Sequence, residues 1–262
     1  MKQLPHVADT ILIDEVEKVE KWIRLMTNLI VERKKKLSQY GVADMSMYER
    51  ASGETIPSIL IAIDNYDSVK DADFGDNFNK LITQIAREGA SVGIHLSISA
   101  GRQSSIRMPL LSNIKSQVAL YVFDDVEIRN IMGKTDLEIE ELPGRGIIKL
   151  ENPALFQTTL PADGEDSLEI IENIQKLAKD MENHWDGDVP EEIPMMPEGV
   201  VEFTVFTQKR KTKKLIEANH LPLGLDFESV SPIGFDPKRD GFLTVVSDRK
   251  DGLDKMTNAL IK

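Results

Sequence analysis

Residues 59–67 read Ile59-Leu60-Ile61-Ala62-Ile63-Asp64-Asn65-Tyr66-Asp67, and this stretch decides the fold. Its five consecutive apolar residues predict a short strand that is buried on both faces of a sheet. The strand ends at Asp64. Ligands of open α/β sheets bind beyond the carboxyl ends of the strands, so we expect the Asp64 side chain to lie at a binding site.

The same stretch has two interpretations. An apolar strand that ends in aspartate is typical of a Walker B segment, whose carboxylate holds the Mg²⁺ ion of a bound nucleotide. An ordinary core strand that runs into an acidic turn has the same pattern. These residues alone leave both interpretations open.

Composition excludes several classes of function. The 262 residues carry a net charge of −12, which disfavours binding to the phosphate backbone of nucleic acids. The absence of cysteine excludes disulfides, thiol catalysis and thiolate zinc sites, and the four histidines show no metal-ligand spacing. No apolar run approaches the roughly 18 residues of a membrane span.

Apolar spacing over residues 1–186 alternates between helical and strand periods. We expect helices at 13–40, 45–50, 74–88, 124–132 and 167–185, and strands at 59–63, 94–100, 117–123, 147–150 and 154–160, the last two pairing with each other. Alternating strands and helices favour an α/β fold with a mainly parallel sheet covered on both faces. The basic run Arg33–Lys36 falls near the end of the first helix, where we expect it to be solvated.

The stretch Asp186–Gly199 is rich in acidic residues and proline, as is typical of an inter-domain linker. Beyond it, Lys209–Lys214 is a dense basic cluster. Strands are expected at 223–226, 233–236 and 242–246, before a helix that starts near Gly252. We therefore divide the chain into a first module over 1–186, a linker over 187–215 and a second piece over 216–262.

Several short motifs follow one another along the chain. They are Leu4-Pro5-His6-Val7, the helix with Trp22 and Met26, the strand Ile59–Asp64, Gly93-Ile94-His95-Leu96, the turn Leu142-Pro143-Gly144-Arg145-Gly146, and Leu221–Asp226 with Pro232-Ile233-Gly234. This ordered set resembles the FtsK/SpoIIIE family of motor ATPases, and the stretch Ser104–Lys115 resembles its type VII secretion branch. The resemblance implies a mainly parallel, RecA-like P-loop sheet covered by helices. It also implies a partial second module that opens with a β-hairpin.

On this resemblance the chain is a fragment whose first module lacks its P-loop half. Asp64 matches the Mg²⁺-binding aspartate of the family. Asn65 stands where active members carry a glutamate that polarises the attacking water, and an amide cannot accept a proton. Arg102, at the tip of the next strand, is expected to sense phosphate or to reach a neighbouring subunit, with an ordinary surface arginine as the alternative.

The second module departs from the P-loop pattern G-x-x-x-x-G-K-[ST]. In the stretch that starts at Ser247, only Gly252 fits that pattern. Leu253 stands in place of the phosphate-binding lysine and Asp254 in place of the Mg²⁺-binding hydroxyl residue. Charged hydrogen bonds are worth about 1.5–3 kcal/mol each, so this exchange should weaken phosphate binding by several kcal/mol.

The expected nucleotide site is therefore degenerate. Its residues are Asp64, Asn65, Arg102, Ser247 and Gly252, with Asp64 as the Mg²⁺ ligand. We expect weak or absent binding of ATP and Mg²⁺ and little or no ATP hydrolysis.

The resemblance implies a part of the cytosolic ATPase array of a type VII secretion motor, with regulatory or substrate-docking modules. Its partners would be other modules of the parent chain, further copies in a hexamer and small helical secreted substrates, but no nucleic acid. It would lie at the cytoplasmic face of the membrane, through an anchor outside this chain. A DNA-translocating motor of the same family and a scaffold without a ligand are the alternatives.

Overall fold

The computed structural model describes residues 4–69, 72–122, 124–199, 201–248 and 250–261. The chain divides into two compact units, Met1–Pro190 and Glu191–Lys262. Among the described residues, no helix combines the length and the apolar character that crossing a bilayer requires.

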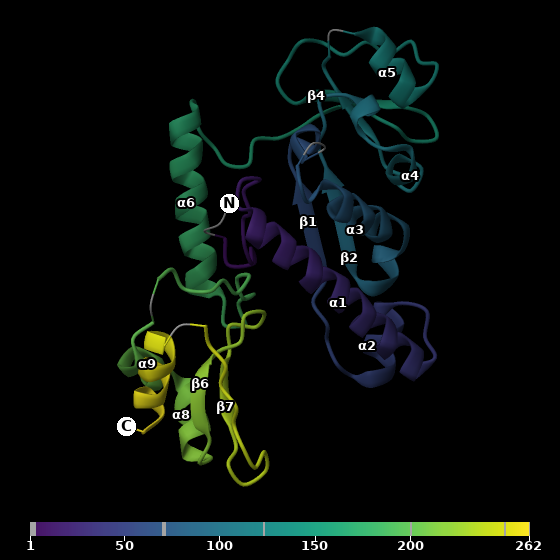
Figure 1. The fold of residues 1–262 in the computed structure, drawn as a ribbon. Helices are drawn as coiled ribbons and strands as arrows, with labels where there is room; N and C mark the ends of the chain where they lie inside the picture. The colour runs from purple at the N-terminus through teal and green to yellow at the C-terminus, as the bar shows by residue number, and fades with distance from the viewer. Residues whose placement is uncertain (1–3, 70–71, 123, 200, 249, 262) are drawn as a thin grey trace. The chain divides into compact units, whose positions relative to one another are not determined.

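The first unit is an α/β structure (Figure 1). Its elements are α1 (Val16–Tyr40), α2 (Met45–Ser52), β1 (Ile59–Ile63), the 3-10 helix η1 (Tyr66–Val69), α3 (Gly75–Glu88), η2 (Gly89–Val92), β2 (Ile94–Ile98), η3 (Gln103–Ser105), α4 (Met108–Leu111), β3 (Val118–Leu120), α5 (Asp125–Met132), β4 (Arg145–Ile148), β5 (Ala154–Gln157) and α6 (Ser167–His184). Strands β1 and β2 pair in parallel, with Ile59 opposite Ile94 and Ile63 opposite Ile98. The predicted α/β class with a parallel sheet is confirmed.

Helices α1 and α3 lie beside β1 and β2 (Figure 1). Helix α3 presents Phe78, Leu81, Ile82 and Ile85 at helical spacing, and these side chains are buried in the main core together with Ile94 of β2. Ile59, Ile61 and Ile63 of β1 pack against the same core. This packing fixes one face of the parallel strand pair.

The opposite face of the strand pair is exposed. Burial alternates along β1, and Leu60 keeps 70% of its side chain accessible to solvent, while Ala62, His95 and Ser97 are also exposed. The expectation that residues 59–63 are buried on both faces is therefore wrong. An apolar run allows burial on both faces, but burial also needs a second covering layer, and no described residues provide one.

Arg33 departs from the expected solvated helix end. Its side chain is buried, and Nη1 donates to the backbone oxygens of Val92 at 2.7 Å and Gly93 at 3.2 Å. Nη2 donates to the Pro57 oxygen at 2.8 Å. Burial lowers the pKa of the Arg33 guanidinium from its usual value. The side chain thus ties α1 to the chain just before β1 and β2.

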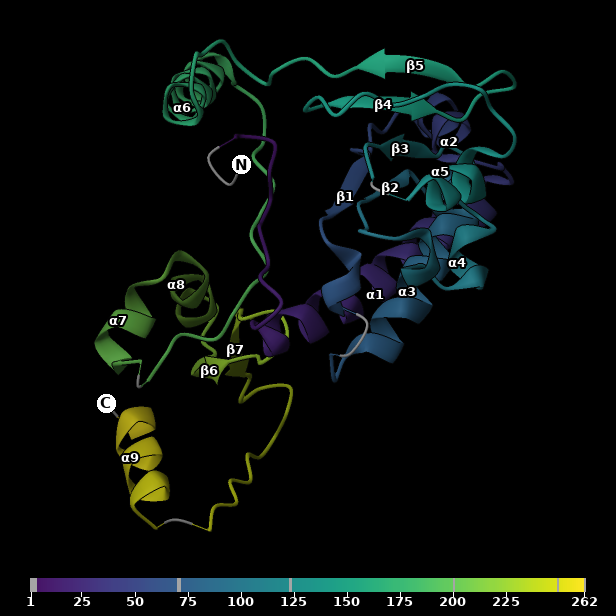
Figure 2. The ribbon, with the colours of Figure 1, turned by 90° about the horizontal axis from the view of Figure 1, so that it is seen from above.

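Strands β3, β4 and β5 form a separate antiparallel sheet (Figure 2). The predicted pairing of the last two strands is confirmed, with Ile147 opposite Leu155. Strand β3 pairs with β4, so it does not extend the parallel sheet. Ile147 and Ala119 join residues of α5 in a second, smaller core.

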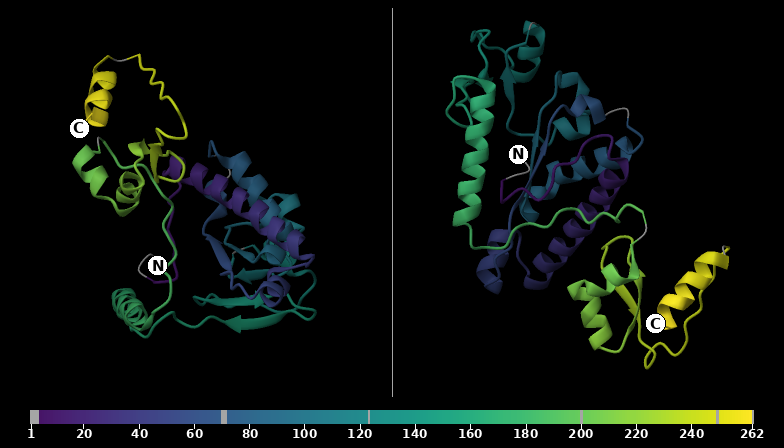
Figure 3. Two further views of the ribbon diagram at one scale, coloured as in Figure 1. Left: turned by 90° about the horizontal axis from the view of Figure 1, so that it is seen from below. Right: turned by 90° about the vertical axis from the view of Figure 1, so that its left-hand side faces the viewer.

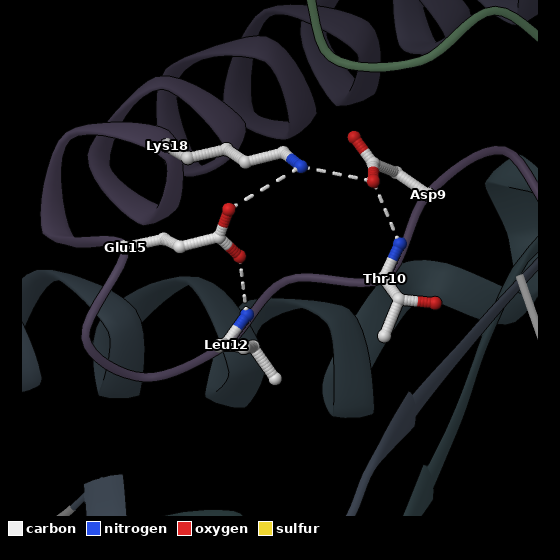
Figure 4. Close-up of polar contacts among 5 residues, drawn as sticks. All are labelled: Asp9, Thr10, Leu12, Glu15 and Lys18. Carbon is white, nitrogen blue, oxygen red and sulfur yellow. Dashed lines mark hydrogen bonds and ion pairs between the residues drawn. The ribbon is translucent and has the colours of Figure 1, made fainter.

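The segment before α1 is held by an ion pair (Figure 4). Lys18 Nζ lies 2.9 Å from Asp9 Oδ1, and the two side chains are only 12% and 4% exposed. Glu15 adds a longer contact to Lys18 at 3.8 Å, and its other oxygen accepts the Leu12 N–H at 2.7 Å. These contacts fix the lead-in segment on the first turns of α1.

The second unit contains a β-hairpin flanked by helices (Figure 3). Its elements are α7 (Phe203–Gln208), α8 (Arg210–Glu217), β6 (Leu221–Leu225), β7 (Pro232–Phe235) and α9 (Lys250–Ile261). The predicted strand at 242–246 is wrong, because residues 241–247 have no regular structure and Phe242 and Val246 are 83% and 90% exposed. A strand needs a neighbouring backbone to pair with, and this segment pairs with none among the described residues.

Candidate functional site

The carboxyl ends of β1 and β2 meet at one edge of the parallel pair. Ile63 lies opposite Ile98, so the residues that follow them, Asp64 and Ser99, are neighbours. Backbone hydrogen bonds continue the pairing past the strands, from Ser99 N to Ile63 O and from Tyr66 N to Ser99 O, both at 2.9 Å. The predicted position of Asp64 at the strand end is confirmed.

Ser99 organises this edge. The Ser99 hydroxyl donates to Asp64 Oδ1, and Ser99 Oγ also accepts the Asn65 N–H at 2.9 Å. One side chain thus sets both the rotamer of the Asp64 carboxylate and the backbone of the residue after it. Asp64, Asn65 and Ser99 are all exposed, so a ligand can reach them.

Asn65 adopts a left-handed backbone conformation, with φ at 53°. This region costs an ordinary L-residue roughly 1–2 kcal/mol, and asparagine tolerates it because its short polar side chain bonds locally. The Asn65 carbonyl accepts two hydrogen bonds from Ser68, from the backbone N–H at 3.0 Å and from the hydroxyl at 2.8 Å. A glutamate here would carry that strain in the same turn.

Asp67 has a role that sequence analysis did not assign. Its Oδ2 accepts the Gly101 N–H at 2.7 Å, which braces the loop after β2 against the turn after β1. The Ser105 hydroxyl and the Gly101 N–H lower the pKa of the Asp67 carboxyl. A carboxylate stabilised in this way is a weak proton acceptor.

Tyr66 anchors the turn after β1 to α3. This side chain is 2% exposed, and its hydroxyl donates to Asn79 Oδ1 on α3. Asn79 Nδ2 in turn donates to the Gly75 carbonyl oxygen at 2.7 Å. Burial raises the pKa of the Tyr66 hydroxyl, so it stays protonated and the turn stays fixed on α3.

Arg102 lies in the loop that Asp67 braces. Its side chain is exposed at the same edge of the strands as Asp64, and its charge helps to lower the pKa of Asp67. The structure thus brings Asp64, Asn65 and Arg102 to one edge of the sheet.

The two remaining predicted site residues belong to the second unit. Ser247 is exposed in the irregular segment, and Gly252 is exposed within α9. Leu253 and Asp254 follow in the same helix. Gly252 is the third residue of α9, so its backbone N–H is among the first four of that helix, which have no acceptor within the helix.

The donors at the strand edge fit a Mg²⁺ ion with one protein ligand. Mg²⁺ is commonly held by one or two carboxylates, with phosphate and water completing an octahedron, and Asp64 offers one exposed carboxylate. The described residues hold no cluster of three or more acidic or histidine side chains suited to a metal. Any Mg²⁺ would therefore depend on the nucleotide it accompanies.

The sequence model of the FtsK/SpoIIIE family matches residues 1–135.

Two curated relatives resemble nearly the whole chain. Type VII secretion system protein EssC of Staphylococcus aureus (strain MRSA252) is 33% identical over 258 residues, which cover 98% of this chain and 17% of that protein. ESX secretion system protein EccC of Geobacillus thermodenitrificans (strain NG80-2) is 32% identical over 263 residues, covering 100% of this chain and 17% of its own length. The chain thus spans about a sixth of the length of these relatives.

A solved structure of EssC from Geobacillus thermodenitrificans, containing ATPases 2 and 3, has the same fold. It superposes with a TM-score of 0.86 at 33% sequence identity, and covers 99% of this chain and 49% of its own. The match extends over both units described above.

Proposed function

The chain belongs to the FtsK/SpoIIIE family, and on that basis we propose that it is part of the ATPase array of a type VII secretion motor. In this proposal it serves as a regulatory or substrate-docking segment with little ATP hydrolysis of its own. The whole relatives are several times longer, so the remaining modules of a parent chain would supply the turnover.

One observation carries the proposal of low turnover, namely the arrangement of side chains after β1. Asp64 would be the metal ligand in this proposal, but the next residue is an amide in a left-handed turn. Asp67, the nearest further carboxylate, is engaged by Gly101 and Ser105. Neither neighbour of Asp64 is therefore suited to take a proton from water.

The exposed face of β1 and β2 supports a division into modules. A two-stranded parallel sheet with one uncovered face is unusual, because parallel sheets are normally covered on both sides. We propose that residues 1–186 are an ATPase module completed by a P-loop half, whose strands and helix would cover Leu60. Residues 187–215 would be the linker and 216–262 the start of the next module, with a degenerate P-loop.

We propose that ATP and Mg²⁺ bind weakly or not at all to this chain alone. Asp64 would contact the metal, and Asn65 and Arg102 would contact the nucleotide from the same edge. Ser247 and Gly252 would mark the second, degenerate site. Bound ATP and Mg²⁺ would supply only their charge and a coupling between nucleotide binding and the conformation of the module.

The wider setting follows from the family and remains part of the proposal. The array would form a hexamer with further copies and bind small helical secreted substrates. A membrane anchor outside this chain would hold it at the cytoplasmic face of the membrane.

Titration calorimetry with Mg²⁺ and ATP tests the nucleotide site. We expect weak heats for the natural chain that disappear in Asp64→Ala and persist in Asp136→Ala, an exposed aspartate outside the site. A scaffold without a ligand would give no heat in any variant. A coupled phosphate-release assay on the same samples should show negligible turnover, and turnover typical of a motor ATPase would refute the regulatory assignment.

A further inference from the structure

Helix α8 carries a strongly basic face. Lys209, at its N-cap, and four cations within it, Arg210, Lys211, Lys213 and Lys214, are all exposed. Successive residues of a helix lie about 100° apart, so the four project over one broad face. Thr212 lies on the opposite face and is fully buried, where α8 packs on β6 and β7. The basic face is therefore oriented away from the core of its own unit.

These cations are not neutralised by the described part of the chain. None of the five forms an ion pair with a described carboxylate, and Lys211 makes only a 3.5 Å contact with the Ser231 hydroxyl. Elsewhere, exposed or half-exposed cations do find acidic partners, such as Lys34 with Glu88 at 2.7 Å and Arg107 with Asp76 at 3.3 Å. Like charges at this density repel one another, so an anionic partner would be favoured.

The size and surroundings of the face decide which anion fits. A membrane or a nucleic acid duplex presents anionic charge over a wide area and would meet the rest of a chain whose net charge is −12. A short peptide meets only charges within about 8 Å at physiological salt. The helix is roughly 12 Å long, a length that two or three turns of a partner helix would match.

An exposed apolar side chain lies beside the cations. Ile216 is 44% exposed and follows Lys213 by three residues, so the two are neighbours on the surface of α8. A phosphate backbone makes no use of such a flank, and an anionic membrane that took it up would meet the rest of a chain with a net charge of −12. An amphipathic helix with glutamates next to leucines would bury the flank while it paired the cations.

We propose that the basic face of α8 is a docking surface for a short acidic, amphipathic helix of a partner protein. The partner would place its glutamates against Lys213, Lys214 and Arg210, and its apolar stripe against Ile216. This inference does not depend on the nucleotide site.

Fluorescence anisotropy tests the proposal. The probe is a fluorescein-labelled helical peptide with a stripe of glutamates beside a stripe of leucines, and its glutamine version is the peptide control. We expect the full chain to bind the acidic peptide and not the glutamine version, with affinity falling as salt is raised. Lys213→Glu with Lys214→Glu should weaken binding by roughly tenfold or more, because two surface pairs become repulsive.

The matched control changes charge equally at another place in the same unit. Lys238→Glu with Arg239→Glu alters two exposed cations after β7 and should leave binding unchanged. A neutral variant, Lys213→Gln with Lys214→Gln, covers the case in which the charge-reversed double variant misfolds. Circular dichroism checks that the neutral variant is folded, and it should also bind the acidic peptide more weakly. Equal loss in the control, absence of peptide binding, or tighter binding of duplex DNA or phosphatidylserine vesicles through the same lysines would overturn the proposal.

Discussion

Replacing Arg33 by methionine removes the group that ties α1 to the chain just before β1 and β2. The guanidinium donates to three backbone oxygens, those of Val92, Gly93 and Pro57, and it is 5% exposed. Methionine keeps the apolar part of the side chain and leaves the three carbonyl oxygens without these donors.

The magnitude follows from two opposing terms. Hydrogen bonds from a charged donor contribute about 1.5–3 kcal/mol each, so three would suggest a large loss. The guanidinium loses hydration on burial, however, and the lowered pKa of Arg33 reflects that cost. We expect a net decrease of about 3 kcal/mol in the free energy of unfolding of the first unit.

Urea unfolding followed by Trp22 fluorescence measures this change. Trp22 packs on Phe78 with ring centroids 5.8 Å apart, so its emission reports on the core between α1 and α3. The chain has two tryptophans, and a Trp185→Phe background leaves Trp22 as the reporter. Lys35→Met, at an exposed position of the same helix, should change the free energy by less than about 0.5 kcal/mol. If Arg33→Met matched that control, the anchoring role would be refuted.

Three further predictions concern the strand edge and the lead-in segment. Asn65→Glu should lower the free energy of unfolding by about 1 kcal/mol while Asn65→Gly should not, because φ is positive there, and phosphate release should stay negligible in both. Asp67→Asn should increase amide hydrogen exchange at Gly101. Hydrogen bonds depress the pKa of Asp67 in the folded state, so the stability that this carboxylate contributes is present above its unfolded pKa. That contribution is lost as the pH falls through the folded pKa, which a urea series at decreasing pH would detect. Asp9→Asn should destabilise the lead-in segment by about 2 kcal/mol in the same urea assay, because Lys18 loses its close partner and keeps Glu15 only at 3.8 Å; a change within error would contradict a stabilising pair.

The sequence predicted the elements that carry their own periodic signal. Strand β1, helices α1 and α3 and the β6–β7 hairpin lie where apolar spacing indicated. Asp64 at the strand end was predicted for the same reason, since the length of the apolar run fixes where the strand stops.

Contacts that depend on register could not be predicted. The Ser99–Asp64 and Asp67–Gly101 hydrogen bonds exist because Ile63 pairs with Ile98, and no local pattern specifies that alignment. Arg33 sits in a run of four cations, and nothing in the run distinguishes the buried one. Helices α7 and α8 lie partly in the range predicted as linker, where the spacing of Phe203, Phe206 and Leu215 was the available signal.

Apolar content also proved insufficient where a partner element is needed. The segment at 242–246 has the composition of a strand and forms none, because no described strand lies next to it. Leu60 belongs to a strand and stays exposed for the related reason that no layer covers it.

The parallel pairing of β1 and β2 also determines the stage of folding at which the edge with Asp64 and Ser99 can form. Asp64 and Ser99 are 35 residues apart in sequence, and the connection between their strands runs through α3. Closing such a loop costs entropy before any contact across it is gained. We therefore expect the Asp64–Ser99 contact to form after α3 has packed against α1. A partly folded chain, such as a nascent one on the ribosome, would contain every residue of this edge and still lack the edge itself.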